Sequence, residues 1–203
     1  MNKKKYIIIA VIILPLIVAL ITGGYLLFGL ENKEGDAQKF AKEYTEVGED
    51  NVFVYRTAEE VIKLMKYGTG VVYLGFPECP WCQTYSKYLN EVAKEVGVDK
   101  IYYYDILEDR ANNTDVYKEI VSLLGDNLQY DEEGNHRVYV PNVSFHVNGE
   151  IVGNDNETSL DTKGFSTPEE YWNDEEVTEL KNTLTTYMEK VYTASNMCTT
   201  CNR

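Results

Sequence analysis

The chain has 203 residues, of which 44% are hydrophobic and 12% aromatic, and its formal net charge at pH 7 is −14. This length is enough for one ordinary domain, with residues left over for a leader and a tail. The strongly acidic balance excludes nucleic acid and anionic lipid headgroups as partners of the folded part, because both would repel it.

The N-terminus carries three lysines at positions 3 to 5, followed by an uncharged run from Tyr6 to Leu30. About 20 apolar residues are enough to cross a bilayer as a helix, so we expect residues 1–30 to form a transmembrane anchor. The lysines before the run and the acidic "ENKEGD" after it predict a single pass through the cell membrane, with a cytoplasmic N-terminus and an extracytoplasmic remainder. A cleaved signal peptide is the alternative. We favour the anchor because the run is longer than a usual signal-peptide core of about 7 to 15 residues and no A-x-A site follows.

Residues 31–50 are polar, with a weak helical pattern at Phe40, Tyr44 and Val47, and we expect a tether that ends in a docking helix. Segments rich in β-branched and aromatic residues then predict strands at 51–56, 71–76 and 101–106. Apolar residues at helical spacing predict helices at 58–68, 82–96 and 115–125. Strands that alternate with helices indicate an α/β fold with a partly parallel sheet and helices on both faces.

The second half of the chain follows a different pattern. Residues 127–140 read as two short extended arms around a turn. The strands "NVSFHV" and "EIVG" flank Asn148-Gly149, a strong hairpin signal because both turn positions require positive φ. Thr167, with Glu170 three residues later, predicts a capping box at the start of the last helical region, whose apolar stripe ends at Val191.

The stretch Cys79-Pro80-Trp81-Cys82 lies between a predicted strand and a predicted helix. A cysteine that opens a helix has its sulfur over unpaired backbone N–H groups and the positive end of the helix dipole, and both favour the thiolate. Cys79 is therefore the expected nucleophile, and Cys82, one turn further on, the resolving thiol. By its spacing alone, the pair is equally one half of a zinc site.

The order of strands and helices, the Cys-Pro-Trp-Cys motif at its junction and the stretch "VYVPNVSFHVNGEIVG" together resemble the thioredoxin family, over residues 51–192. More narrowly, the chain resembles membrane-anchored, exported bacterial thioredoxin-like proteins, including bacteriocin transport accessory proteins. The resemblance implies a thioredoxin fold, a central mixed β-sheet flanked by helices. It also implies a cis-proline at Pro141 beside the dithiol and a backbone at Val140 that pairs with an extended substrate.

The resemblance implies a thiol-disulfide oxidoreductase that acts on protein or peptide thiols and disulfides. Such an enzyme needs a redox partner in the membrane or outside it, and no metal or organic cofactor. Two departures from the family stand out. The usual Trp-Cys-Gly-Pro-Cys is absent, and the buried aspartate six residues before the first cysteine falls here on Tyr73. The group that takes the proton from Cys82 is therefore unassigned, with Glu78 as a candidate, and the direction of electron flow stays open.

Trp81 lies between the two cysteines, where its ring either contacts a polypeptide substrate or shields the sulfur. The tail, residues 193–203, carries a second pair, Cys198 and Cys201. This pair closes a local disulfide, exchanges electrons with the first pair, or binds zinc jointly with it. We favour electron exchange, since a flexible tail raises the effective concentration of one dithiol near another. For the whole protein, the alternative to an enzyme is a non-catalytic docking module of an export system, with a permanent bond between Cys79 and Cys82.

Overall fold

The computed structural model describes residues 35–156 and 164–200, with side chains up to residue 197. Residues Asp36–Arg203 form one compact unit. The anchor expected at residues 1–30 and the cysteine at position 201 lie outside the described residues, as does the side chain of Cys198. Within the described ranges, no helix has the length and apolar character needed to cross a membrane.

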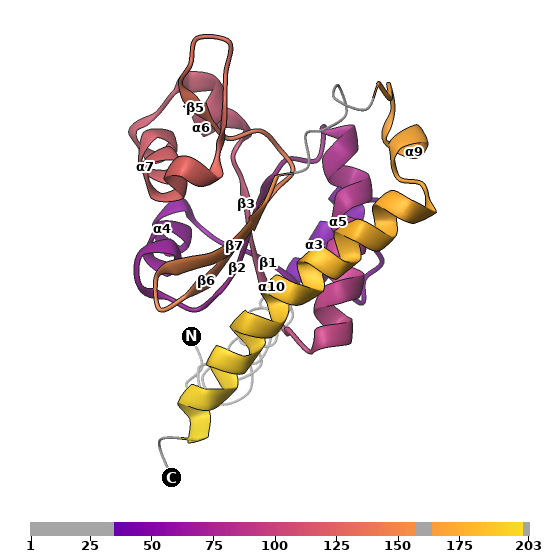
Figure 1. Cartoon of the computed structure of the whole chain (residues 1–203), viewed down its shortest axis with the longest axis vertical. Helices are drawn as coiled ribbons and strands as arrows, with labels where there is room; N and C mark the ends of the chain where they lie inside the picture. The colour runs from indigo at the N-terminus through magenta and orange to yellow at the C-terminus, as the bar shows by residue number, and fades with distance from the viewer. Residues whose placement is uncertain (1–34, 157–163, 201–203) are drawn as a thin grey trace, which may run out of the picture. The chain divides into compact units, whose positions relative to one another are not determined.

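A mixed sheet of five strands forms the centre of the molecule (Figure 1), in the order β1-β3-β2-β6-β7. Strands β1, β3 and β2 run parallel to one another. Strand β6 is antiparallel to β2, and β7 is antiparallel to β6. The strand bounds are β1 Phe53–Tyr55, β2 Gly70–Gly75, β3 Ile101–Asp105, β6 Asn142–Val147 and β7 Glu150–Asp155. A separate two-stranded sheet pairs β4 Gln129–Tyr130 with β5 His136–Arg137. The predicted α/β class with a partly parallel sheet is confirmed.

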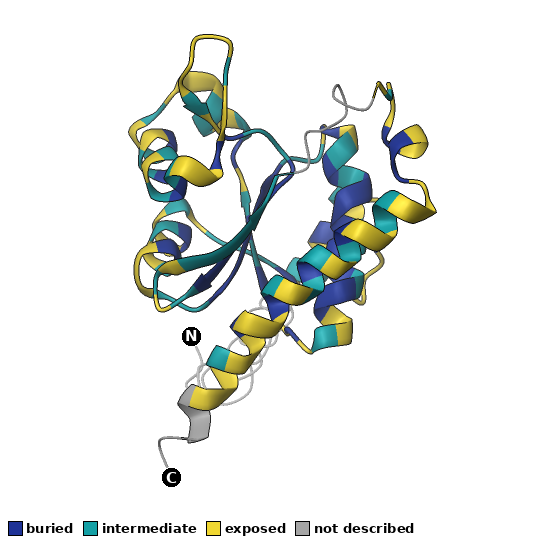
Figure 2. Cartoon of the chain, in the orientation of Figure 1, coloured by how far each residue is buried: buried dark blue, intermediate teal, exposed yellow. Residues whose placement is uncertain are grey.

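Helices cover both faces of the central sheet (Figure 1). On one face lie α3 Asp36–Glu43, α5 Pro80–Val96 and α10 Asp174–Thr200, and on the other α4 Ala58–Tyr67, α6 Leu107–Asn112 and α7 Asp115–Leu124. The short helices η2 Gly125–Asn127 and α9 Pro168–Tyr171 complete the order. Figure 2 shows buried residues along the strands and on the helix sides that pack on the sheet.

The central strand β2 is buried at all six positions. Successive side chains of a strand point to opposite faces, so Val71 and Tyr73 enter one core while Val72 and Leu74 enter the other. The almost continuously apolar sequence of this segment is the pattern expected of a strand that is covered on both sides. Strand β2 ends at Gly75, four residues before Cys79, so this buried strand positions the start of the cysteine pair.

The hairpin between β6 and β7 turns at Asn148-Gly149, as predicted. Both residues have positive φ, 51° and 83°, which is the backbone of a type I′ turn. The Gly149 N–H also donates a hydrogen bond of 2.8 Å to the Gly68 carbonyl, so the turn is attached to the end of α4.

The docking helix expected within residues 31–50 is present as α3. The Phe40 side chain of α3 is fully buried and stacks on Tyr44 and Phe53, with ring centroids 4.1 and 3.8 Å apart. Val47 is also buried. Phe40, Tyr44 and Val47 therefore belong to the same core as Phe53 of β1, and this attaches α3 to the domain.

The last helix runs through residue 193, where the sequence pattern set the start of the tail. Helix α10 continues to Thr200, so residues 193–200 are helical. The last helical region is in fact two helices, because α9 ends at Tyr171 and α10 begins at Asp174. The predicted start at Thr167 is confirmed, since its hydroxyl accepts a hydrogen bond of 3.3 Å from the backbone N–H of Glu170.

Candidate active site

Cys79 is the N-cap residue of α5 and Pro80 is its first helical residue. Strand β2 ends four residues before Cys79, at Gly75. Proline suits the first helical position because the N–H that it lacks has no partner within the helix there. The expected placement of the pair, between a buried strand and the start of a helix, is confirmed.

The two sulfurs differ in their access to solvent. Both cysteines are free thiols; Cys79 is 7% exposed and Cys82 is fully buried. The backbone N–H of Cys82 donates to the Cys79 sulfur over 3.2 Å, so the sulfur caps the helix as a serine oxygen ordinarily would. Only Cys79 is placed to meet a molecule from outside, and Cys82 can react only with what Cys79 has bound.

The electrostatic environment also separates the two thiols. The pKa of Cys79 is lowered, first by a hydrogen bond from the Cys82 side chain. Burial opposes this change, while the backbone N–H groups of Cys82 and Trp81 and the charge of Arg110 add to it. Burial raises the pKa of Cys82 well above that of an ordinary thiol, and the neighbouring Cys79 raises it further. Cys79 is therefore the thiol that ionises first, and Cys82 stays protonated.

A cluster of three buried tyrosines, the phenol cluster, lies beneath Cys82 and consists of Tyr44, Tyr73 and Tyr103. The Tyr73 hydroxyl donates to the Cys82 carbonyl over 3.1 Å, and the Tyr44 hydroxyl donates to that of Tyr103 over 3.1 Å. Burial raises the pKa of all three phenols, so they are uncharged at neutral pH. The groups beneath Cys82 are therefore neutral hydroxyls. One of them, Tyr73, stands at the position where the resemblance to thioredoxins implies an aspartate.

Val140 and Pro141 lie beside the Cys79 sulfur. The Cys79 thiol points its hydrogen at the Val140 carbonyl, with 3.9 Å between sulfur and oxygen. The peptide bond between the two residues is cis. Pro141 is buried and Val140 is half-buried. The structure therefore brings together the dithiol and the two residues that the resemblance pairs with substrate, although they are about 60 positions apart in the chain.

Trp81 is half-buried and packs edge-on against Tyr171 of α9, with ring centroids 5.6 Å apart. Tyr171 in turn contacts Phe165 and Trp172. The segment around α9 therefore covers one side of Trp81. Both readings of Trp81 stay open, because the ring is neither fully covered nor fully exposed.

Arg110 is a site residue that the sequence did not single out. It lies on α6, directly after β3, and β3 is the parallel neighbour of β2 with Gly75 opposite Asp105. Its guanidinium carbon lies 4.9 Å from the centre of the Phe76 ring, and its Nη1 donates to the Val138 carbonyl over 3.5 Å. Ligands of α/β proteins commonly bind beyond the carboxyl ends of parallel strands. The position of Arg110 just after a predicted strand is therefore the sequence signal that could have identified it.

The remaining candidates fall outside this site. Glu78, the candidate proton acceptor, is exposed, and its charge helps to raise the pKa of Asp105, after the larger effect of burial. The joint zinc site with Cys198 and Cys201 is not described, because neither of those side chains is. Among the described residues, no group of three or more histidine, cysteine, aspartate or glutamate side chains could hold a metal ion.

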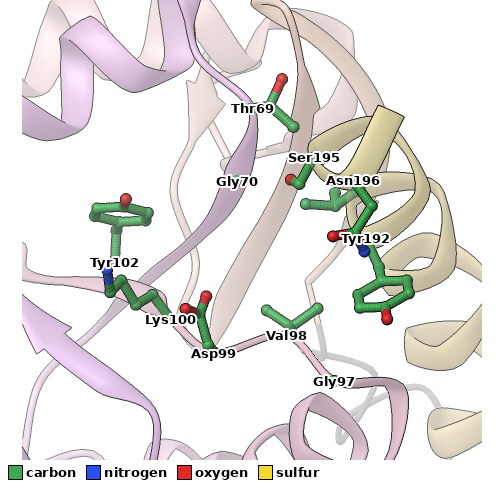
Figure 3. Close-up of a pocket in the computed structure, with 11 residues that line it drawn as sticks. Thr69, Gly70, Gly97, Val98, Asp99, Lys100, Tyr102, Tyr192, Ser195 and Asn196 are labelled. Atoms are coloured by element: carbon green, nitrogen blue, oxygen red, sulfur yellow. The ribbon is translucent and has the colours of Figure 1, made fainter. Parts of the chain in front are cut away.

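A pocket of about 410 Å³ lies at the opposite end of β2 and β3 from the cysteines. Figure 3 shows Tyr102 and Lys100 on one side and Tyr192 of α10 on the other, with Gly70 at the start of β2 between them. Neither Cys79 nor Cys82 lines it. The pocket is therefore separate from the dithiol.

Comparison of the chain with protein-family models, with curated proteins and with solved structures found no match in any of the three. Its function is therefore inferred from its own residues and their geometry.

Proposed function

We propose that this chain is a thiol-disulfide oxidoreductase with a thioredoxin fold, tethered to the cell membrane by residues 1–30 and facing the extracytoplasmic side. The observation that supports it best is the asymmetric dithiol. Cys79 caps α5, keeps 7% of its surface exposed and has a lowered pKa, whereas Cys82 is fully buried and has a raised one. The position of Val140 and Pro141 against the Cys79 sulfur supports a peptide or protein as substrate.

In the first step, the Cys79 thiolate attacks one sulfur of a substrate disulfide. The bond between the two substrate sulfurs breaks, a mixed disulfide forms between Cys79 and one of them, and the other leaves as a thiolate that takes a proton from water. The low pKa of Cys79 provides the reactive thiolate at neutral pH.

In the second step, the Cys82 sulfur attacks the Cys79 sulfur and displaces the substrate. A disulfide forms between Cys79 and Cys82, and the proton of Cys82 ends on the departing substrate thiol. Two electrons have then passed from the protein to the substrate. The hydroxyl of Tyr73 donates to the Cys82 carbonyl and also lowers the pKa of Cys82, an effect that favours charge on this sulfur but is smaller than the opposite effect of burial. The reverse sequence oxidises substrates, and a second dithiol or disulfide protein at the membrane or outside it restores the pair.

Two single substitutions in the full-length protein test this function. Cys79→Ser is expected to abolish exchange with disulfide substrates, because it removes the nucleophile. Cys82→Ser is expected to form a mixed disulfide with substrate that cannot be resolved and is visible as a mass increase. A protein that keeps its partners after Cys79→Ser, and never forms the mixed disulfide after Cys82→Ser, is a docking module instead of an enzyme.

The reduction potential decides the direction of electron flow. It is measured by equilibrating the protein with glutathione buffers, alkylating free thiols and reading both cysteines by peptide mass spectrometry. A value near about −270 mV identifies a reductant and a value near about −120 mV an oxidant. A pair that stays unreactive across this range contradicts the proposed function.

A further inference from the structure

Arg110 is a half-buried cation that pairs with no carboxylate among the described residues, and the anion that acts on it is the Cys79 thiolate. Removing a guanidinium from water is unfavourable unless an opposite charge compensates it. Arg110 forms no ion pair among the described residues, and of its five N–H donors only one is accounted for, by the long bond to the Val138 carbonyl. Burial lowers its pKa and the charge of Arg137 lowers it further, while Tyr117, Cys79 and Cys82 oppose this change.

The carboxylates nearest to Arg110 in the chain are engaged elsewhere. Asp109 accepts hydrogen bonds from the hydroxyls of Tyr104 and Thr114. The Glu108 side chain accepts from the Asn112 amide over 3.4 Å, and the Asp105 side chain accepts from the backbone N–H of Leu107 over 2.9 Å. In a chain with 33 acidic and 19 basic residues, this guanidinium has acidic neighbours and pairs with none of them.

Arg110 contacts both segments that hold the Cys79 sulfur. It covers the ring of Phe76, whose carbonyl accepts a 3.2 Å hydrogen bond from the Cys79 backbone. It also bonds to Val138, two residues before the carbonyl that faces the sulfur. A substrate cysteine joined to Cys79 therefore brings its neighbouring residues close to the guanidinium.

A second cation lies on the same side. The Arg137 side chain is exposed, with its guanidinium 5.5 Å from the centre of the Tyr139 ring, and its charge acts on Arg110. Two like charges at one site repel each other unless an anion lies between them. Guanidinium groups bind carboxylates with paired, charge-assisted hydrogen bonds.

We propose that Arg110, assisted by Arg137, forms a carboxylate-binding subsite beside Cys79, so that preferred substrates carry an aspartate or glutamate next to the reacting cysteine. This inference rests on the proposed oxidoreductase function and names a class of substrate for it: peptides or proteins with an acidic residue flanking the cysteine.

The test uses two disulfide-bonded peptides that differ only in glutamate or glutamine beside the reacting cysteine. The rate constant for oxidation of the reduced full-length protein by each peptide is measured by acid quenching and mass spectrometry at about 0.15 M ionic strength, where exposed charges are screened beyond about 8 Å. Arg110 also affects the Cys79 thiolate, but that effect is common to both peptides and cancels in the ratio of their rate constants.

The wild-type protein is expected to prefer the glutamate peptide by about tenfold, the value of one charge-assisted hydrogen bond at a half-buried site. The ratio should fall to about one in Arg110→Gln and stay well above one in Arg110→Lys, which keeps the charge. Lys118→Gln removes the same charge from an exposed ion pair with Asp115 on α7 and is expected to leave the ratio unchanged.

Each other outcome has a definite meaning. Equal rates for the two peptides in the wild type, or an unchanged ratio in Arg110→Gln, overturn the subsite and leave the oxidoreductase function intact. If Arg110→Gln does not fold, Arg137→Gln takes its place in the test. A ratio clearly below the wild-type value in Arg137→Gln supports the subsite, and an unchanged ratio refutes it. Exchange with neither peptide refutes the proposed function and the subsite with it.

Discussion

His146 lies on β6 in the core between the sheet and α4, where its side chain is fully buried. Its Nε2 is 2.9 Å from the Ser144 hydroxyl, and its Nδ1 has no well-aligned hydrogen-bond partner among the described residues, although the Met65 backbone opposes the effect of burial on its pKa. Burial lowers its pKa to about 4, whereas a histidine in an unfolded chain has a pKa of about 6.5. We predict that this one residue makes the folded domain less stable in mild acid.

The sign and size follow from proton linkage. Above pH 6.5 both states hold a neutral histidine, so the residue adds no pH dependence. Between pH 6.5 and pH 4 the unfolded chain binds a proton that the folded protein does not, and stability falls as the pH falls. The free energy of unfolding should decrease by about 2 kcal/mol between pH 7 and pH 5, and by about 3 kcal/mol once the pH is below 4.

Urea denaturation of the full-length protein at pH 7 and pH 5, followed by circular dichroism, measures this change. His146→Phe removes the titrating group. Between pH 7 and pH 5 its free energy of unfolding should decrease by about 2 kcal/mol less than that of the wild type. His136, the other of the two histidines in the chain, is half-buried, and His136→Gln serves as the matched control. A His146→Phe variant with the same pH dependence as the wild type would refute the reasoning, because the carboxylates that titrate in this range are common to both proteins.

Three further predictions concern reactivity and stability. In the folded, reduced protein, iodoacetamide at pH 7 should modify Cys79 and leave Cys82 unmodified until urea unfolds the chain, because of the two only Cys79 is partly exposed and has a lowered pKa. Peptide mass spectrometry measures the labelling of each cysteine, and equal labelling would contradict the assignment. Gly149→Ala should lower the free energy of unfolding, measured by urea denaturation, by about 2 kcal/mol or more, because φ is +83° and a Cβ there would lie 2.2 Å from the Lys66 carbonyl oxygen. A neutral effect would mean that the turn relaxes. Gln83→Ala removes three side-chain hydrogen bonds to the backbone and should cost about 2 kcal/mol by the same assay, with no loss expected if water replaces them.

The parts of the fold that could be predicted are those with a strong local pattern. The buried strand at Val71 to Leu74 is continuously apolar, and Asn148-Gly149 fixes a hairpin through backbone sterics alone. Cys79 at the start of α5 follows from the two elements on either side of it. In each case neighbouring residues contain the whole signal.

The sequence is less informative where structure depends on distant partners. Helix α3 is mostly polar and its pattern is weak, and the depth at which Phe40 is buried follows from its packing on Phe53. Helix α6 is six residues long, too short for a periodic pattern, and Arg110 becomes a site residue only because β3 lies beside β2. The apolar stripe of α10 ends at Val191, so periodicity alone did not show that the helix continues to Thr200, although residues 189–203 contain no glycine or proline to stop it.

Under the proposed function Cys79 has two tasks at once, since the sulfur that reacts is also the acceptor that caps α5. A thiolate in that place interacts favourably with the first turn of the helix, and a disulfide sulfur carries no charge to do so. Electron transfer and the stability of α5 are therefore linked, and the linkage is reciprocal. Oxidation then weakens the first turn of α5, a 17-residue helix that packs against α10. A substitution elsewhere on α5 that destabilises this turn more in one redox state than in the other therefore shifts the reduction potential of the pair.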